Sequence, residues 1–182
     1  MKKAMIAGLC MAAGLVAAAE MKVGTVNLET LIKNHPNHES NRTLVKSTAD
    51  DYRRKMEARQ EQAKALMEDG KKIQSDYQNP MLSVAAKADL QKKMDGLQRK
   101  LYSLQQDMRA DDQHYQEELA DLQQRLFKIE KTDVEAKITE FAKDQGYDLI
   151  VDVAACGFSK PDLDVTEDIL KKMGVEKPKA DK

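Results

Sequence analysis

The stretch IQSDYQNPMLSVAAKADL, residues 73–90, decides the fold, because it is where a long helical pattern breaks. Pro80 is the only proline within the two helical runs, and a proline disfavours helix at the residue before it. Ser83 follows, and its hydroxyl is suited to cap a new helix. Two helices joined by so short a turn run antiparallel. The sequence therefore predicts a helical hairpin with its tip near residues 78–83.

On both sides of this turn, apolar residues recur in alternating steps of three and four. This spacing places them along one stripe of a helix, as in the seam of a coiled coil. The outgoing run holds Val45, Ala49, Tyr52, Met56, Arg59, Ala63, Leu66, Gly70, Ile73 and Tyr77, and the returning run holds Leu90, Met94, Leu97, Leu101, Leu104, Met108, Asp111, Tyr115, Glu118 and Leu122. Residues 38–128 are therefore predicted to form an arm of roughly 60 Å. We interpret four interruptions of the stripe as points of bending: Arg59, Gly70, Asp111 and Glu118.

Residues 1–19 have the pattern of a secretory signal peptide, with a basic start, an apolar core and three alanines before Glu20. We expect cleavage between Ala19 and Glu20, and therefore export. The alternative is a lipoprotein anchored at Cys10, although the residues before this cysteine fit the required apolar box poorly. No later stretch approaches about 18 consecutive apolar residues, so we expect no membrane-spanning helix in the exported chain.

Removal of this peptide leaves 28 basic against 31 acidic side chains and a single cysteine, Cys156. One cysteine excludes a disulfide within the chain, so Cys156 is either a small buried residue or half of a bridge between two chains. Nucleic-acid binding is not expected of an exported chain with a net negative charge.

Charge is segregated along the predicted arm. Residues 71–100, around the turn, carry seven basic against three acidic side chains, whereas residues 101–144 carry an acidic excess. Such a run is commonly a solvated helix face, but a segregated one also creates a field that attracts an anionic membrane surface or an acidic partner. The basic residues of this tip are Lys71, Lys72, Lys87, Lys92, Lys93, Arg99 and Lys100.

The segments that flank the arm, residues 20–37 and 129–174, are predicted to form one discontinuous body. Residues 21–27 alternate polar and apolar side chains, as a half-buried strand does, and residues 148–153 are typical of a more buried strand. We expect residues 154–159 to pair back as a third strand.

Two short helices complete this body, over residues 28–33 and 167–173. Thr166 is expected to cap the second helix and Gly174 to end it. The charged tail, residues 175–182, is expected to be disordered. The predicted fold class is therefore α+β, with a long antiparallel helical arm on a small β body.

Three short strands are a weak base for such an arm. An isolated small sheet with unpaired edges is marginal in water. We therefore expect several copies of the chain to pool their strands into one closed β body. The residues expected to build this shared body are Val23, Val26, Leu149, Val151 and Val153.

Three motifs resemble those of one protein family: VGTVNL at residues 23–28, YDLIVD at 147–152 and DVTEDIL at 164–170. With the signal peptide and the interrupted hairpin, they are similar to the Skp/OmpH family of periplasmic chaperones. The resemblance implies a homotrimer whose strands form a central barrel, with three helical arms around a cavity. It implies that unfolded outer-membrane β-barrel proteins are held there, without ATP, before membrane insertion. Members tend to have basic arm tips, which implies weak contact with an anionic membrane surface or lipopolysaccharide.

A protein that holds unfolded clients needs apolar side chains that adapt to varied shapes. Methionine is suited to this because it is unbranched and polarizable. The candidates for client contact lie off the seam: Leu44, Met67, Met81 and Leu82, with Ala65 and Leu119 as weaker ones. Methionines on the seam are interpreted as packing residues instead: Met56, Met94 and Met108.

No group of residues indicates catalysis or a cofactor. His35 and His38 flank Pro36 with few other ligands nearby, which argues against a metal site, and the sequence has no glycine-rich phosphate loop. The chain is therefore predicted not to be an enzyme. The alternative function is that of a secreted structural or tethering coiled coil that binds the envelope surface through its basic tip.

Overall fold

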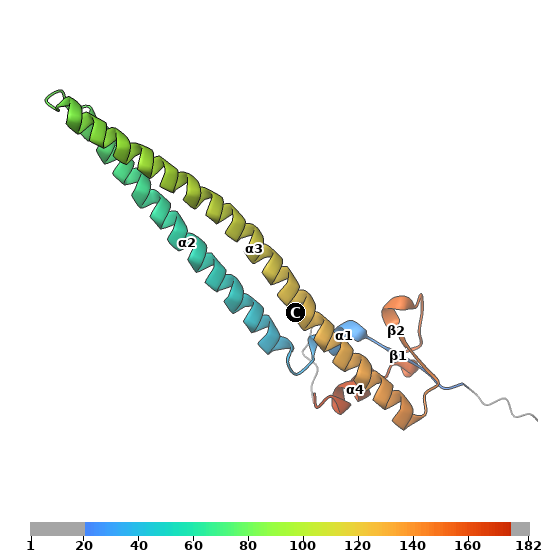
Figure 1. The fold of residues 1–182 in the computed structure, drawn as a ribbon. Coiled ribbons are helices and arrows are strands. Elements are labelled where there is room, and N and C mark those ends of the chain that lie inside the picture. The colour runs from blue at the N-terminus through green and yellow to red at the C-terminus, as the bar shows by residue number, and fades with distance from the viewer. Residues whose placement is uncertain (1–20, 176–182) are drawn as a thin grey trace, which may run out of the picture.

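The structure, a computed structural model, describes residues 21–175 and consists of a long helical arm on a small body (Figure 1). In chain order the elements are β1 (Val23–Val26), α1 (Leu28–Lys33), α2 (His38–Tyr77), α3 (Val84–Gln145), β2 (Leu149–Asp152), the 3₁₀ turns η1 (Val153–Ala155) and η2 (Pro161–Leu163), and α4 (Thr166–Lys172). The α+β fold class is confirmed. The predicted signal peptide, its cleavage site and residues 176–182 lie outside the described residues.

The predicted antiparallel hairpin is formed by α2 and α3, and its turn is the predicted tip (Figure 1). Within the turn, the Asn79 side chain accepts a hydrogen bond from the backbone N–H of Met81 at 3.0 Å. Ser83 caps α3 as predicted, because its Oγ accepts a hydrogen bond from the N–H of Ala86 at 3.2 Å. The longer helix, α3, continues past the arm and into the body, so a single rigid element joins the two parts.

Burial along α2 follows the predicted stripe, because every seam position there except Tyr77 is at least partly buried. In α3 the prediction holds at every seam position except Glu118. Glu118 is exposed, and the neighbouring Leu119 is partly buried in its place. The buried stripe returns to its predicted position at Leu122, so the miss at Glu118 is a single local exception.

The polar interruptions of the seam lie opposite one another across the hairpin. Arg59 Nη2 is 2.7 Å from Asp111 Oδ2, and the Tyr52 hydroxyl donates a hydrogen bond to Glu118. The Tyr52 ring also stacks on Tyr115, with 4.1 Å between the ring centroids. These contacts bridge the two helices. Arg59, Asp111 and Glu118 therefore also join the two helices, and their interpretation as points of bending stays a prediction.

Because the seam carries the arm, truncation of its most buried leucine is expected to be costly. Leu104 is buried on α3, and a Leu104→Ala substitution should lower the free energy of unfolding by about 2–5 kcal/mol. Chemical unfolding followed by far-ultraviolet circular dichroism measures the effect. Leu44→Ala is the matched control, since Leu44 is largely exposed on α2. Equal effects of the two substitutions would contradict the seam.

The body contains a two-stranded parallel sheet. Val23 pairs with Leu149 and Val26 with Asp152, in one continuous register. Parallel strands require a long crossover, and here the crossover is α1 together with the whole arm. Beyond this sheet, Thr25 forms an isolated parallel bridge with Asp164. Both strand predictions, over residues 21–27 and 148–153, are confirmed in their central residues.

The predicted third strand, over residues 154–159, is wrong. The chain turns into η1 directly after β2, because the Asp152 side chain accepts a hydrogen bond from the backbone N–H of Ala154 at 3.1 Å. This local bond draws the backbone out of the extended conformation and ends the strand.

The core of the body lies where α1 and α4 pack against the C-terminal part of α3. Leu31, Val134, Ile169 and Leu170 have the most buried side chains. An ion pair between Lys172 of α4 and Asp144 of α3 joins the C-terminal ends of these helices. The hydrogen bond to the Asp144 carboxylate raises the pKa of Lys172. The body is therefore a three-helix cluster beside a small sheet.

The cap of α4 differs from the prediction. Thr166 is the first residue of the helix, and its backbone N–H donates to the Asp164 carboxylate at 2.9 Å. The Thr166 hydroxyl instead accepts a hydrogen bond from the N–H of Asn27, also at 2.9 Å, and so links α4 to β1. Gly174 follows the helix in the left-handed conformation, at φ 80°, as predicted. Val175, assigned to the tail, packs against the core.

Candidate functional site

The four candidates for client contact are spread along the arm. Met81, at the tip, is 89% exposed, while Leu44 and Met67, on α2, are 47% and 46% exposed. Leu82 is partly buried and lines a shallow hollow of the tip together with Leu90. Leu44 and Met67 are separated by roughly 35 Å of helix. The structure therefore exposes three of the four residues and gathers them into no common pocket.

Further exposed apolar side chains lie on α3 and after β2, where the sequence reasoning did not place contacts. They are Val84, Tyr102, Phe127, Ile129 and Phe158. The four on α3 all lie off the predicted seam. A search for every apolar residue outside the heptad stripe, rather than for methionine and leucine, would have found them.

The basic residues of the tip are exposed except Lys87, which is partly buried, and several have local partners. Lys71 pairs with Glu68 at 2.7 Å and Lys92 with Asp89 at 4.0 Å, one helical turn apart in each case. The hydrogen bond from Lys71 lowers the pKa of Glu68. Exposed pairs of this kind contribute little to stability. The positive field of the tip is therefore partly compensated by neighbouring carboxylates.

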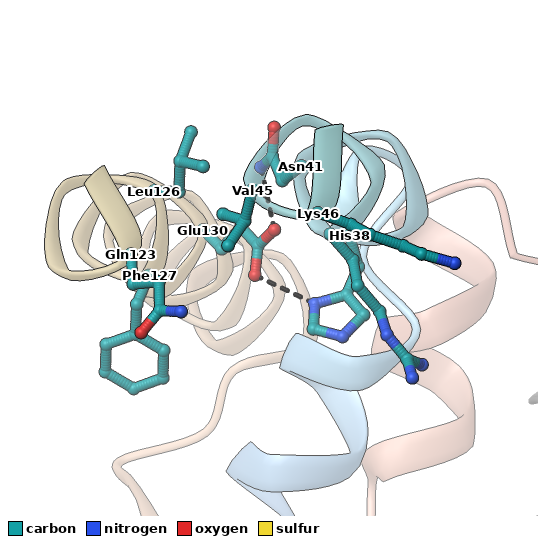
Figure 2. Close-up of a pocket in the computed structure, with 9 residues that line it drawn as sticks. His38, Asn41, Val45, Lys46, Gln123, Leu126, Phe127 and Glu130 are labelled. Atoms are coloured by element: carbon teal, nitrogen blue, oxygen red, sulfur yellow. Dashed lines mark hydrogen bonds and ion pairs between the residues drawn. The ribbon is translucent and has the colours of Figure 1, made fainter. Parts of the chain in front are cut away.

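A cavity of about 470 Å³ lies between α2 and α3 at the base of the arm (Figure 2). We call it the base cavity. Its lining comes from both helices and consists of His38, Asn41, Arg42, Val45, Lys46, Gln123, Leu126, Phe127 and Glu130. Figure 2 shows the buried Glu130 carboxylate directed toward His38 and Asn41, with the Phe127 ring pointing away from it. Sequence reasoning missed this cavity, because its lining residues are about 80 positions apart and no motif joins them.

Glu130 is held by two side chains of α2. His38 Nδ1 lies 3.0 Å from Glu130 Oε2, and the Asn41 amide donates to Glu130 Oε1 at 2.8 Å. A buried carboxylate is costly unless it is hydrogen-bonded in this way. The two contacts tie the start of α2 to α3.

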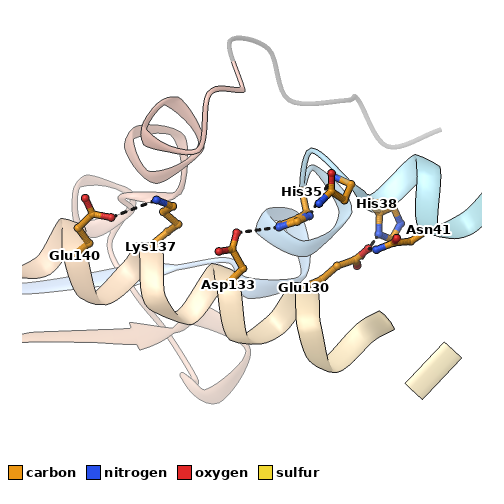
Figure 3. A network of polar contacts seen from close by, with 8 residues as sticks. His35, His38, Asn41, Glu130, Asp133, Lys137 and Glu140 are labelled. Atoms are coloured by element: carbon orange, nitrogen blue, oxygen red, sulfur yellow. Dashed lines mark hydrogen bonds and ion pairs between the residues drawn. The ribbon is translucent and has the colours of Figure 1, made fainter. Parts of the chain in front are cut away.

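His35, in the turn between α1 and α2, makes a second contact with α3 (Figure 3). Its Nδ1 accepts a hydrogen bond from the backbone N–H of Asn37 at 3.2 Å, so the ring proton is on Nε2. That N–H lies 3.0 Å from Asp133 Oδ2. The two histidines thus bond to different carboxylates, and residues 21–175 contain no cluster of three side chains suited to a metal ion.

The residues expected to build a shared body differ in exposure. Val26 is buried in the core of its own chain, whereas Val23 and Val151 are partly buried. Leu149 and Val153 are exposed on or next to β2. Beyond them, Phe158 is 83% exposed, and Cys156 is a partly buried free thiol.

The family comparison agrees with this architecture. The model of the family described as "Outer membrane protein (OmpH-like)" matches residues 22–173, which include the body, the whole arm and α4. None of the curated proteins that were compared matches the chain. No helix within residues 21–175 has an apolar stretch long enough to cross a bilayer. An exposed helical hairpin on a small body, matched by this model from β1 to α4, shows that the chain belongs to the OmpH-like family of periplasmic chaperones for outer-membrane proteins.

Proposed function

We propose that this protein is an ATP-independent holdase that captures unfolded outer-membrane β-barrel proteins between its helical arms. It keeps them from aggregating before they are inserted into the membrane. The observation that carries the proposal is the arm itself, a paired helical hairpin that exposes separate apolar side chains from Leu44 near its base to Met81 at its tip.

The distribution of these side chains suits a disordered client. Strands of outer-membrane barrels alternate apolar and polar residues, and in water they tend to aggregate through their edges. A chaperone without an energy source has to bind such a chain weakly at many points, so that release needs no fuel. Several arms acting on one client combine weak contacts into firm capture through effective concentration.

A homotrimer is part of this proposal, and the body gives the physical reason. The described sheet has only two strands, and a sheet of that size is marginal by itself. Next to it, Leu149, Val153 and Phe158 are exposed to solvent in the single chain. Pooling of strands from three chains into a barrel would cover these side chains and close the sheet edges.

The proposal includes export and a role for the tip. Cleavage after Ala19 would release the mature chain into the periplasm, where its clients pass. The exposed lysines of the tip, such as Lys93 and Lys100, would make weak contact with an anionic membrane surface or with lipopolysaccharide. The alternative function is that of a tethering coiled coil that uses only these tips and holds no client.

An aggregation assay separates the two functions. A denatured outer-membrane β-barrel protein is diluted into buffer with or without a threefold molar excess of the mature chain, and light scattering is followed. We expect strong suppression of scattering without ATP, because the arms cover apolar segments of the client. Serum albumin at the same mass concentration is the control for non-specific crowding. Unchanged scattering would favour the tethering function.

A further inference from the structure

The base cavity combines an apolar surface with uncompensated positive charge. Val45, Leu126 and Phe127 supply the apolar part, and Phe127 is 54% exposed. The volume of about 470 Å³ falls within the range of small-ligand sites. A large apolar group therefore fits between α2 and α3 without any displacement of the helices.

Two cations of the lining, Arg42 and Lys46, form no ion pair with any of residues 21–175. The next arginines along the same helix differ in this respect. Arg53 pairs with Asp50 at 3.1 Å, and Arg59 pairs with Asp111 at 2.7 Å. Cations beside an apolar cavity and without carboxylate partners are placed to receive an anionic group from a ligand.

The one acidic group of the lining offsets only one of its two positive charges. Glu130 is 3% exposed and is engaged by His38 and Asn41 on the side facing the body. Figure 2 shows the Lys46 side chain extended away from Phe127. Both cationic side chains are exposed, and exposed side chains change rotamer within nanoseconds. Either cation can therefore swing toward the cavity when a ligand enters.

We propose that the base cavity binds the carboxyl-terminal residue of an unfolded polypeptide when that residue is aromatic. Such a residue carries an apolar ring and a carboxylate together. The ring occupies the space lined by Val45, Leu126 and Phe127. The terminal carboxylate meets Arg42, whose planar guanidinium matches a carboxylate with two parallel hydrogen bonds. This inference rests on the proposed function, because it assumes that the arms receive unfolded chains.

The test uses the full mature protein and three fluorescein-labelled decapeptides that share their first nine residues. Binding is measured by fluorescence polarization. The peptides end in phenylalanine with a free carboxylate, in phenylalanine carboxamide, or in alanine with a free carboxylate. We expect the first to bind about tenfold more tightly than either of the others, because each of the others lacks one of the two groups that the cavity receives.

Variants of the protein connect this preference to the cavity. Arg42→Gln should weaken binding of the free acid about tenfold and leave binding of the carboxamide unchanged. Lys46→Gln provides a second variant if Arg42→Gln lowers the thermal stability. Arg53→Gln is the matched control, because it removes one charge from the same helix away from the cavity, and it should bind all three peptides like the parent.

Equal binding of the acid and the carboxamide would overturn the proposal, as would a free-acid affinity that both cavity variants leave unchanged. If, in addition, laurate bound the parent and lost affinity in Arg42→Gln, the cavity would be a site for an acyl chain. The aggregation assay separates this inference from the proposed function. Full suppression of scattering by Arg42→Gln, with no peptide preference in the parent, would reject the cavity proposal and leave the holdase function standing.

Discussion

A chain in which residues 48–128 are replaced by a short Gly-Ser linker is expected to keep its subunit number and to lose all suppression of aggregation. The deletion removes the upper arm, including the exposed apolar side chains of Met67 and Met81. It leaves β1, β2, α1, α4 and the body part of α3 intact. The core that joins these elements, with Leu31, Val134 and Ile169, does not involve the deleted residues.

Mass by light scattering after size exclusion, together with the aggregation assay, measures both outcomes. The matched control removes residues 148–173 from the same parent. This control loses β2 and α4, and we expect it to lose association. If the armless chain were monomeric and the control still associated, the arms would assemble by coiled-coil pairing and the proposed shared body would be wrong. If the armless chain still suppressed aggregation, client binding would reside in the body.

A Val134→Asp substitution is expected to unfold the body and abolish association. Val134 is 0% exposed at the centre of the core. A lone carboxylate buried there costs several kcal/mol, which is a large part of the total stability of about 5–15 kcal/mol that a domain of this kind has. The long α3 helix depends on this packing, because an amphipathic helix gains most of its stability from tertiary contacts.

Ile129→Asp is the control for this substitution, since it makes the same chemical change five positions earlier on the same helix. Ile129 is 62% exposed, so we expect a change in stability within about 0.5 kcal/mol. Thermal unfolding followed by circular dichroism, with the mass in solution, measures both variants. A Val134→Asp variant that melts like the parent would mean that the end of α3 is not packed into a core.

These experiments test three parts of the molecule: the arm, the body and the junction between them. The first separates the arm from the body, and the second tests the packing that makes the body a unit. The peptide experiment concerns a cavity at the junction of the two. The junction is defined by the contacts of His35 with Asp133 and of His38 with Glu130, which join the start of α2 to α3 (Figure 3).

Short-range features of the fold could be predicted because they depend on residues close together in the chain. The tip follows from Pro80 and Ser83, and the hydroxyl cap of Ser83 is present as expected. The two strands and α1 lie within the predicted ranges, because alternation and helix periodicity are legible in a few residues. The failures nearby were also local. The Asp152 and Asp164 side chains bond to the backbone after them, and this chemistry was missed.

The candidate site could be predicted only in part. Off-seam spacing correctly placed Leu44, Met67 and Met81 at the surface. The exposure of Tyr102 and Phe127 was missed, because the search was limited to flexible side chains. The exposure of Glu118 and the partial burial of Leu119 beside it were missed, because the repeat places only the first of these two positions on the stripe.

By itself, the sequence determined that this chain forms a helical hairpin arm flanked by short strands, since proline, capping and periodicity act within one or two helical turns. Only the tertiary structure decided what meets across the hairpin. Glu130 is buried by partners 89 and 92 positions away, and the parallel pairing of β1 with β2 spans the entire arm. The base cavity exists because two helices with separate patterns diverge beside the body, and no local pattern encodes the space between them.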